Sequence, residues 1–278
     1  MIDGKTINSG TGGLVGSARR IGAMMLRHLF LFRGSWPRIL ELAYWPIMQV
    51  LLWGFITQFF VQHSSWLVQA AGALLAGVML WDVLFRSQLG VSISFLEEMW
   101  SRNLGQLFVT PLHPVEFILS MTGMSLLRTL VGLLPASLFA WLLYAYSIYG
   151  MGLPLLAFFA NLMLFGWAIG LGVAGVLLRY GLGAESLAWV LIFALAPVSA
   201  IYYPVAVLPS WLQPVAWALP SAHVFEGMRA VLLDGVFRAD LFWGAVALDL
   251  VYFALGAGIF LYAFRVARRL GLLLQAGE

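Results

Sequence analysis

Residues 153–178 read LPLLAFFANLMLFGWAIGLGVAGVLL and contain no charged side chain. A helix rises about 1.5 Å per residue, so a stretch of this length exceeds the roughly 30 Å thickness of the hydrocarbon core of a bilayer. An apolar run that is not interrupted over such a length is typical of a transmembrane helix and not of a buried core helix. The stretch therefore predicts a helix that crosses a membrane.

The same pattern recurs along the chain. Together with the first stretch it predicts six spans, near residues 39–61, 67–94, 116–145, 153–178, 186–208 and 241–264. The composition agrees, since 62% of the 278 residues are hydrophobic and only 10% are charged. We therefore expect an all-α integral membrane protein with six transmembrane helices, in which residues 1–13 form a disordered cytoplasmic tail and residues 14–278 a single transmembrane domain.

The basic residues orient these spans. An even number of spans places both termini on one side of the membrane, and cytoplasmic segments carry an excess of arginine and lysine. If the N-terminus lies inside, the outer loops hold only Arg229 and Arg238. The cytoplasmic side then holds Lys5, Arg19, Arg20, Arg27, Arg33, Arg38, Arg102, Arg179, Arg265, Arg268 and Arg269. We expect a multi-pass protein of the inner (cytoplasmic) cell membrane, with both termini in the cytoplasm.

Several classes of site are excluded by composition and spacing. The net charge of +3 reflects orienting arginines and predicts no nucleic-acid binding, and the absence of cysteine excludes disulfides and thiolate metal sites. Gly4-Lys5-Thr6 resembles the end of a phosphate-binding loop but follows neither a strand nor an upstream glycine. No catalytic residue, metal site or cofactor is predicted in this chain, and we expect it not to be an enzyme.

Residues 14–33 carry too many charges to form a span. Their apolar residues nevertheless recur every three or four positions, at Leu14, Ala18, Ile21, Met25, Leu29 and Phe32. This spacing predicts an amphipathic helix at the cytoplasmic interface, with its apolar face in the acyl boundary and Arg20 and Arg27 among lipid phosphates as interfacial anchors. The helix either only orients the protein or also connects it to a cytoplasmic partner.

The cytoplasmic loop at residues 97–114 reads EEMWSRNLGQLFVTPLHP. Leu104, Leu107 and Phe108 share one helical face, and the prolines that follow end any helix. The loop predicts a short amphipathic helix. It either inserts into a groove of another protein and transmits force, or is an ordinary turn between spans.

The outer loop between the last two expected spans is cut by prolines into apolar pieces of roughly ten to fourteen residues, a length typical of re-entrant or interfacial helices. Ser221 is a candidate N-cap of the second piece, and Glu226 and Arg229 are spaced to pair on one face. The loop forms either a lid over a pathway or a rigid aromatic anchor at the headgroups.

Four charges fall at membrane depth, where each costs roughly 2.5 to 3.5 kcal/mol on insertion scales, so each needs a partner. Asp82 and Arg86 are spaced to pair along one helix, while Arg128 and Asp249 both reach mid-depth of their spans. We expect these four residues to form an intramembrane polar network. Such a network either clamps helices together or lines a path for a polar or anionic substrate.

The order of these elements resembles the membrane subunits of ABC exporters. The resemblance rests on the interfacial helix, the six spans, the Glu-x-x-x-Arg-Asn-Leu-Gly-x-Leu-x-x-Thr-Pro loop and the outer Tyr-Pro...Leu-Pro-x-Trp-Leu-x-Pro...Pro hairpin. The most similar subclass is the small six-helix permease of polysaccharide, lipid and drug exporters, called the type V fold.

The resemblance implies roles for two sets of residues. The loop after the second span would be the coupling helix that docks on the ATPase, formed by Glu98, Arg102, Asn103, Leu104, Gly105, Leu107 and Pro111. Residues 205–233 would be the outer re-entrant half-helices. The outer gate would then comprise Tyr203, Pro204, Pro209, Trp211, Leu212, Pro220, Glu226 and Arg229.

The function implied is that of a permease subunit of an ATP-driven ABC exporter, which moves an amphiphilic or large solute (polysaccharide, glycolipid, lipid or drug) out of the cytoplasm. Its partners would be two ATPase subunits, which bring the ATP and Mg, a second permease copy expected to form a homodimer, and membrane lipid. Two alternatives remain open. One is an ion-coupled secondary transporter that uses Asp82, Arg128 and Asp249 as a proton relay, and the other is a non-transporting membrane assembly factor.

Overall fold

The computed structural model describes residues 13–34, 36–63 and 67–271, so that residues 1–12 of the expected tail lie outside it. The described residues form helices without a strand, which confirms the predicted all-α class. The α-helices are α1 (Leu14–Arg33), α2 (Trp36–His63), α3 (Leu67–Trp100), α4 (Leu104–Val109), α5 (Pro114–Tyr144), α6 (Leu153–Tyr180), α7 (Leu187–Leu195), α8 (Gln213–Trp217), α9 (Pro220–Arg229) and α10 (Ala239–Leu270). Short 3₁₀ turns lie at Ile148–Met151, Gly181–Ala184 and Val205–Val207, and a π turn at Ala230–Asp234 extends α9.

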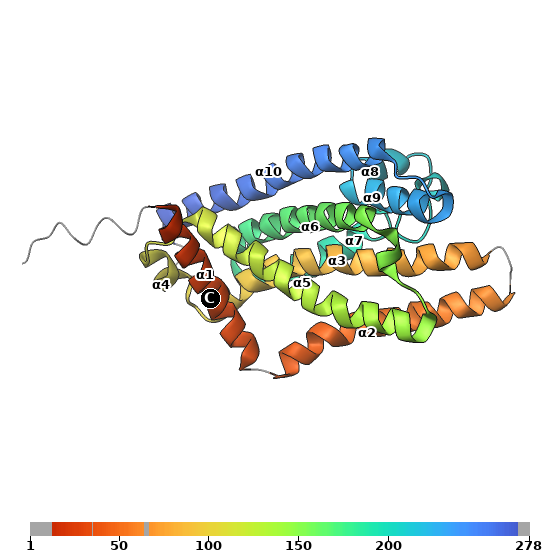
Figure 1. Ribbon diagram of the computed structural model, residues 1–278. Coiled ribbons are helices and arrows are strands. Elements are labelled where there is room, and N and C mark those ends of the chain that lie inside the picture. The colour runs from red at the N-terminus through yellow and green to blue at the C-terminus, as the bar shows by residue number, and fades with distance from the viewer. Residues whose placement is uncertain (1–12, 35, 64–66, 272–278) are drawn as a thin grey trace, which may run out of the picture.

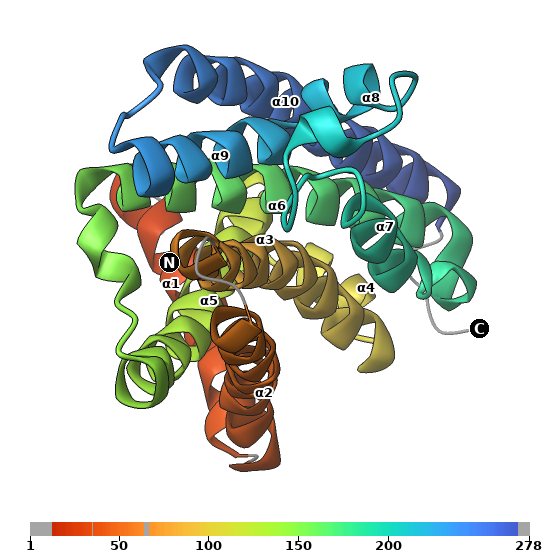
Figure 2. The ribbon, with the colours of Figure 1, turned by 90° about the vertical axis from the view of Figure 1, so that its right-hand side faces the viewer.

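Five helices of the described part are long and apolar enough to cross a membrane, namely α2, α3, α5, α6 and α10. They run side by side along the molecule, with α1 and α4 at one end and α8 and α9 at the other (Figure 1). In the end-on view α3 lies at the centre, with α6 and α10 on one side and α2 and α5 on the other (Figure 2). The span within α3 is 78% buried, whereas that within α10 is 22% buried and leaves most of its apolar surface facing outward.

Small residues allow the two central helices to approach each other closely. A Cβ placed on Gly166 of α6 would lie 2.9 Å from the backbone nitrogen of Gln88, and one on Gly170 would lie 2.8 Å from the Gln88 carbonyl oxygen. Neither position could hold a larger side chain without moving α3. The α3–α6 contact is therefore a backbone-to-backbone contact, of the kind that stabilises helix pairs in membranes.

The fifth predicted span, at 186–208, is wrong as a continuous helix. Only the nine residues of α7 are α-helical there, and turns and bends follow from Ala196 to Tyr203 before the 3₁₀ turn at Val205–Val207. Pro197 explains the end of the helix, because proline has no N–H to donate to the carbonyl oxygen four residues before it and its ring crowds that turn. The chain still passes along the bundle, since Ala188 packs in the core cluster that contains Leu104 of α4, while Ile192 packs in the cluster that contains Val224 of α9.

Candidate functional site

The helix α3 continues six residues beyond the expected end of its span and stops in a defined turn. The N–H of Asn103 donates to the carbonyl oxygen of Glu98 at 3.1 Å, and the N–H of Arg102 donates to that of Met99 at 2.9 Å. This pair of bonds is the Schellman arrangement, which requires a left-handed residue, and Arg102 adopts a φ of 53°. The turn reverses the chain, so α4 begins directly against the end of α3.

The apolar face of α4 is buried within the chain. Leu104 is 1% and Leu107 7% exposed, and both belong to a core cluster with Phe117 of α5 and Leu177 of α6. The interpretation of Leu104 and Leu107 as residues that enter a groove of another protein is therefore wrong, because their side chains fasten α4 to its own bundle. Among the other residues expected in the coupling helix, Asn103 and Gly105 are half-buried.

The opposite side of α4 faces outward. Five exposed residues, on α4 or directly beside its two ends, form what we call the docking surface: Arg102, Gln106, Val109, Thr110 and Pro111. The valine is 87% exposed, although it is apolar. Sequence reasoning named Arg102 and Pro111 but missed the other three, because it assigned the apolar face of the helix to the partner. The available signal was an apolar side chain, Val109, directly before Thr110 and Pro111 and two positions after the buried Leu107, which places it on the opposite side of the helix.

Ion pairs join α1 to the end of α3. Arg27 Nη2 lies 2.8 Å from Glu98 Oε2, and the fully buried ring of His28 lies 3.5 Å from Glu97 Oε2 and 3.7 Å from Glu98 Oε1. Arg128 of α5 completes this group, with Nη2 3.0 Å from Glu97 Oε2. Glu98, expected to touch the ATPase, is 1% exposed and instead binds α1.

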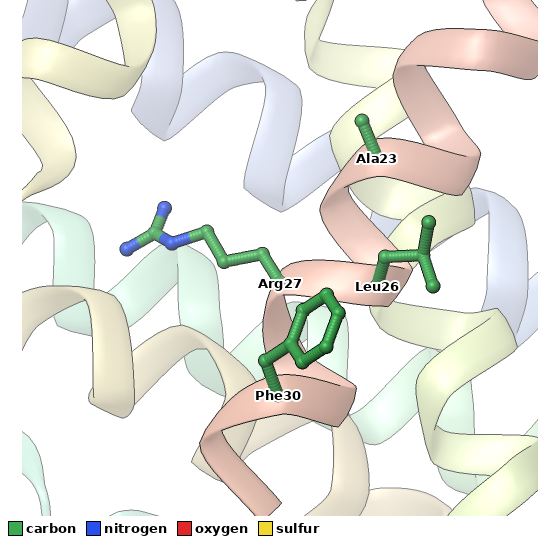
Figure 3. Close-up of a pocket in the computed structure, with 4 residues that line it drawn as sticks. All are labelled: Ala23, Leu26, Arg27 and Phe30. Carbon is green, nitrogen blue, oxygen red and sulfur yellow. The ribbon is translucent and has the colours of Figure 1, made fainter.

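A second pair fixes the first half of α1. The guanidinium of Arg20 donates to both carboxylate oxygens of Glu116, at 2.8 and 2.5 Å, and this hydrogen bonding raises the pKa of Arg20 above its ordinary value. We expected Arg20 and Arg27 among lipid phosphates, but their guanidinium groups instead bind carboxylates of the bundle. The exposed face of α1 carries several apolar residues beside Arg19, and Leu26 extends from it on the side away from Arg27 (Figure 3).

At the opposite end of the bundle, the predicted pair of Glu226 and Arg229 is confirmed, with 3.1 Å between Arg229 Nη2 and Glu226 Oε1. The pair also holds the irregular segment that precedes α8. Glu226 Oε1 accepts a hydrogen bond of 2.6 Å from the N–H of Val205, and Arg229 Nη1 donates to the carbonyl oxygen of Ala200 at 2.9 Å. These contacts fasten residues 200–205 to α9.

The two outer helices differ from the expected half-helices of ten to fourteen residues. The helix α8 has five residues, and α9 has ten with Pro220 at its first turn. Leu219 is the N-cap of α9, so the prediction for Ser221 is wrong, and its buried hydroxyl donates to Ser199 Oγ at 2.9 Å instead. The remaining residues of the expected gate lie at this end of the molecule. The Tyr203 hydroxyl donates to the Pro197 carbonyl oxygen, and Pro204 and Pro209 flank the 3₁₀ turn. Trp211 is 73% exposed, whereas Leu212 packs on a small core cluster.

The four charges at membrane depth do not form one network. Asp82 and Arg86 pair as predicted, with 2.6 Å between Asp82 Oδ2 and Arg86 Nε. Arg128 pairs with Glu97 instead, because α3 remains helical beyond the expected span and carries that carboxylate to it. Asp249 is 1% exposed, and among the described residues neither of its oxygens has a hydrogen-bond partner. A continuous proton relay through Asp82, Arg128 and Asp249 is therefore not present.

A family model described as ABC-2 type transporter matches residues 21–233, well over half of the 278 residues. The chain belongs to the ABC-2 type transporter family. The match begins in α1, includes the docking surface and ends at the π turn after α9. No curated protein matches the chain.

Membership of the ABC-2 family confirms the resemblance to an ABC transporter permease. In this family the membrane domain is a permease component, which is not itself catalytic and associates with ABC ATPase partners. The apolar helices and the family together identify this ABC-2 transporter chain as a multi-pass membrane protein. The docking surface and the ion pairs behind it are accordingly the candidate site for that association.

Proposed function

We propose that this chain is the permease subunit of an ATP-driven exporter in the inner (cytoplasmic) membrane, with both termini in the cytoplasm. Two separate ATPase subunits, which hold the ATP and Mg, would contact the docking surface on α4. The solute would be amphiphilic or large, a polysaccharide, glycolipid, lipid or drug. It would leave the cytoplasm along a path that this chain forms with a second copy of itself.

The observation that carries this proposal is the two-sided character of α4. One side presents the docking surface, while Leu104 and Leu107 on the other side are buried in the core of the bundle. The tight turn at Arg102 joins α4 directly to α3, and Arg27 joins the same end of α3 to α1. A displacement of α4 by a partner would therefore move α1 and α3 with it, which an ordinary turn between spans would not do.

The proposed solute class and the second copy rest on the packing and on the aromatic residues. The close backbone contact between α3 and α6 leaves no space for a bulky solute between these two helices. The solute would therefore pass between two copies of the chain and not through one. Large rings are exposed near the outer end, among them Trp211 and Trp243. Such side chains suit sugar rings and lipid headgroups, because they offer an apolar face and a polar N–H.

Single-cysteine cross-linking tests the docking, because the chain contains no natural cysteine. We expect Gln106→Cys and Thr110→Cys to form disulfides with cysteines placed on a co-expressed ABC ATPase, and Trp211→Cys, exposed at the opposite end, to form none. Gln106→Cys labelled in intact cells by a membrane-impermeant maleimide would overturn the proposal, because the docking surface would then face outward.

A second measurement concerns the energy source. In proteoliposomes that contain the chain and its ATPase, we expect ATP hydrolysis to fall several-fold in Val109→Asp, which places a charge on the most exposed apolar residue of the docking surface. Leu233→Asp, at an exposed apolar position near the outer end, is the matched control and should leave hydrolysis unchanged. Solute flux driven by a proton gradient without an ATPase would support the secondary transporter instead, and a complex without flux would support the assembly factor.

A further inference from the structure

The interface between α6 and α10 contains two buried polar side chains at the same level. The ring of Phe165 packs on that of Tyr252, with centroids 5.2 Å apart, and a Cβ on Gly256 would lie 2.9 Å from the carbonyl carbon of Ala168. The two helices are thus parallel neighbours, and at these two contacts the facing residues are 87 and 88 positions apart. The same offset places Asn161 opposite Asp249, one to two turns before these contacts.

Both residues belong to the stripes by which the helices meet. Asn161 precedes Phe165 by four positions and Ala168 by seven, and Asp249 precedes Tyr252 by three and Gly256 by seven, so each lies on the same helical face as the contact residues. Their burial agrees, since Asn161 is 3% and Asp249 1% exposed. Both side chains are therefore buried away from lipid and water, and the offset at the neighbouring contacts puts their positions opposite each other across the α6–α10 interface.

If Asp249 is ionised, these two side chains offer hydrogen-bond acceptors to each other but no donor. Asn161 uses its Nδ2 to donate to the carbonyl oxygen of Ala157 at 2.7 Å, which leaves its Oδ1 as an acceptor. Among the described residues, neither this Oδ1 nor either carboxylate oxygen of Asp249 has a donor. Three acceptors would meet without a hydrogen between them, an arrangement that buried polar groups avoid.

No cation compensates a charge on Asp249 within the described residues. Arg179, at the far end, is the one charged residue in the sequence of α6. On α9, which also packs on α10, Glu226 and Arg229 pair with each other and with residues 200–205. His223 of α9 lies against Gly244, five positions before Asp249. A carboxylate that is isolated in this way neutralises by taking up a proton.

We propose that Asp249 binds a proton and is held as a neutral carboxylic acid, whose O–H donates to Oδ1 of Asn161 and clamps α10 to α6. The proton supplies a donor for Asn161 Oδ1 and removes the buried charge, and it leaves the second carboxyl oxygen as an uncharged acceptor. If α6 and α10 separate and water enters, the O–H bond breaks, the proton passes to water and a carboxylate remains. Proton occupancy at this site is therefore coupled to the closed packing of the two helices, independently of how the transporter is powered.

Infrared spectroscopy of the purified protein in lipid at neutral pH tests the proton directly. We expect a carbonyl-stretch band of a protonated carboxylic acid, which moves to lower frequency in D₂O and in protein with aspartate labelled by ¹³C at the carboxyl carbon. The band should disappear in Asp249→Asn and persist in Asp240→Asn, since Asp240 is exposed and paired with Arg238 on the same helix. Absence of the band from the wild-type protein would overturn the proposal.

Two further variants test the assignment of the band to Asp249 even if Asp249→Asn does not fold. In Asp82→Asn the band should persist, because the partner of Asp82 is the Arg86 cation; its loss there would assign the neutral acid to Asp82 and refute the proposal. In Asn161→Leu the acid loses its acceptor, and the band should shift. An unshifted band would refute Asn161 as the partner.

Discussion

Replacement of Gly256 by alanine tests the close packing of α10 on α6. An added Cβ at this position would overlap the carbonyl oxygen of Ala168 and lie 2.9 Å from its carbonyl carbon and 3.2 Å from its Cα. All three atoms are backbone, so no rotamer change can relieve the contact. An ordinary contact of 3.4 Å to the carbonyl carbon alone needs a separation of about 0.5 Å, and the overlap with the carbonyl oxygen requires more than that.

Two effects of opposite sign determine the expected stability change. Overpacking of a well-packed interface costs roughly 1 to 3 kcal/mol. The change from glycine to alanine within a helix returns about 0.5 to 1 kcal/mol, because alanine loses less backbone entropy. The net range is roughly 0 to 2.5 kcal/mol, and because the overlapping atoms are all backbone we expect Gly256→Ala to lower the free energy of unfolding by about 2 kcal/mol, towards the upper end.

Gly258 of the same helix provides the matched control. It is exposed, and a Cβ there would meet no atom within 4 Å, so Gly258→Ala should be neutral or slightly stabilising. Unfolding of the purified variants in mixed detergent micelles, followed by tryptophan fluorescence, measures both changes under one condition. Equal effects of the two substitutions would show that the α6–α10 contact is looser than described and would refute the reasoning.

Three further substitutions test other contacts. Arg102→Gly should stabilise the chain by about 1 kcal/mol in thermal unfolding, because glycine adopts a positive φ without the steric cost, yet it should weaken ATPase stimulation by removing a cation from the docking surface. Arg128→Glu should destabilise the protein by roughly 3 to 5 kcal/mol, since it leaves Glu97 buried beside a second carboxylate. The exchange double variant with Glu97→Arg should recover much of the folded yield on size-exclusion chromatography, whereas no recovery would argue against a direct pair. Arg229→Ala should cost about 1.5 to 3 kcal/mol by removing charged hydrogen bonds to residues 200–201, and faster proteolysis of the outer hairpin than in Arg229→Lys would reveal it.

Local spacing predicted the interactions that lie within one helix. Asp82 and Arg86 are four positions apart and Glu226 and Arg229 three, so helical geometry alone brings each pair together. The partner of Arg27, in contrast, is Glu98, which lies 71 residues away along the chain. Since lipid phosphate and a distant carboxylate offer the same chemistry to a guanidinium, the sequence could not distinguish them.

Hydropathy correctly predicted five long helices, but it also predicted a sixth where the structure has only the short helix α7 followed by turns. A window of apolar residues measures how well a segment tolerates lipid, and residues 186–208 satisfy it whether or not their backbone is helical. Pro197 and Pro204 were the signals that the segment is broken. The lack of a hydrogen-bond partner for Asp249 among the described residues also escaped prediction, because spacing along one helix does not show which residues of other helices face it.

The uninterrupted length of α3 has a mechanical consequence. Its 34 residues span about 50 Å as one rod, with no proline in its sequence. At its C-terminal end it joins the turn before α4. Near its N-terminal end a Cβ on Gly77 would lie 2.9 Å from the carbonyl oxygen of Ile201, within the segment tethered by Arg229. A force applied to α4 at one membrane face would thus be transmitted to the other face by one continuous helix, without an intermediate loop or kink.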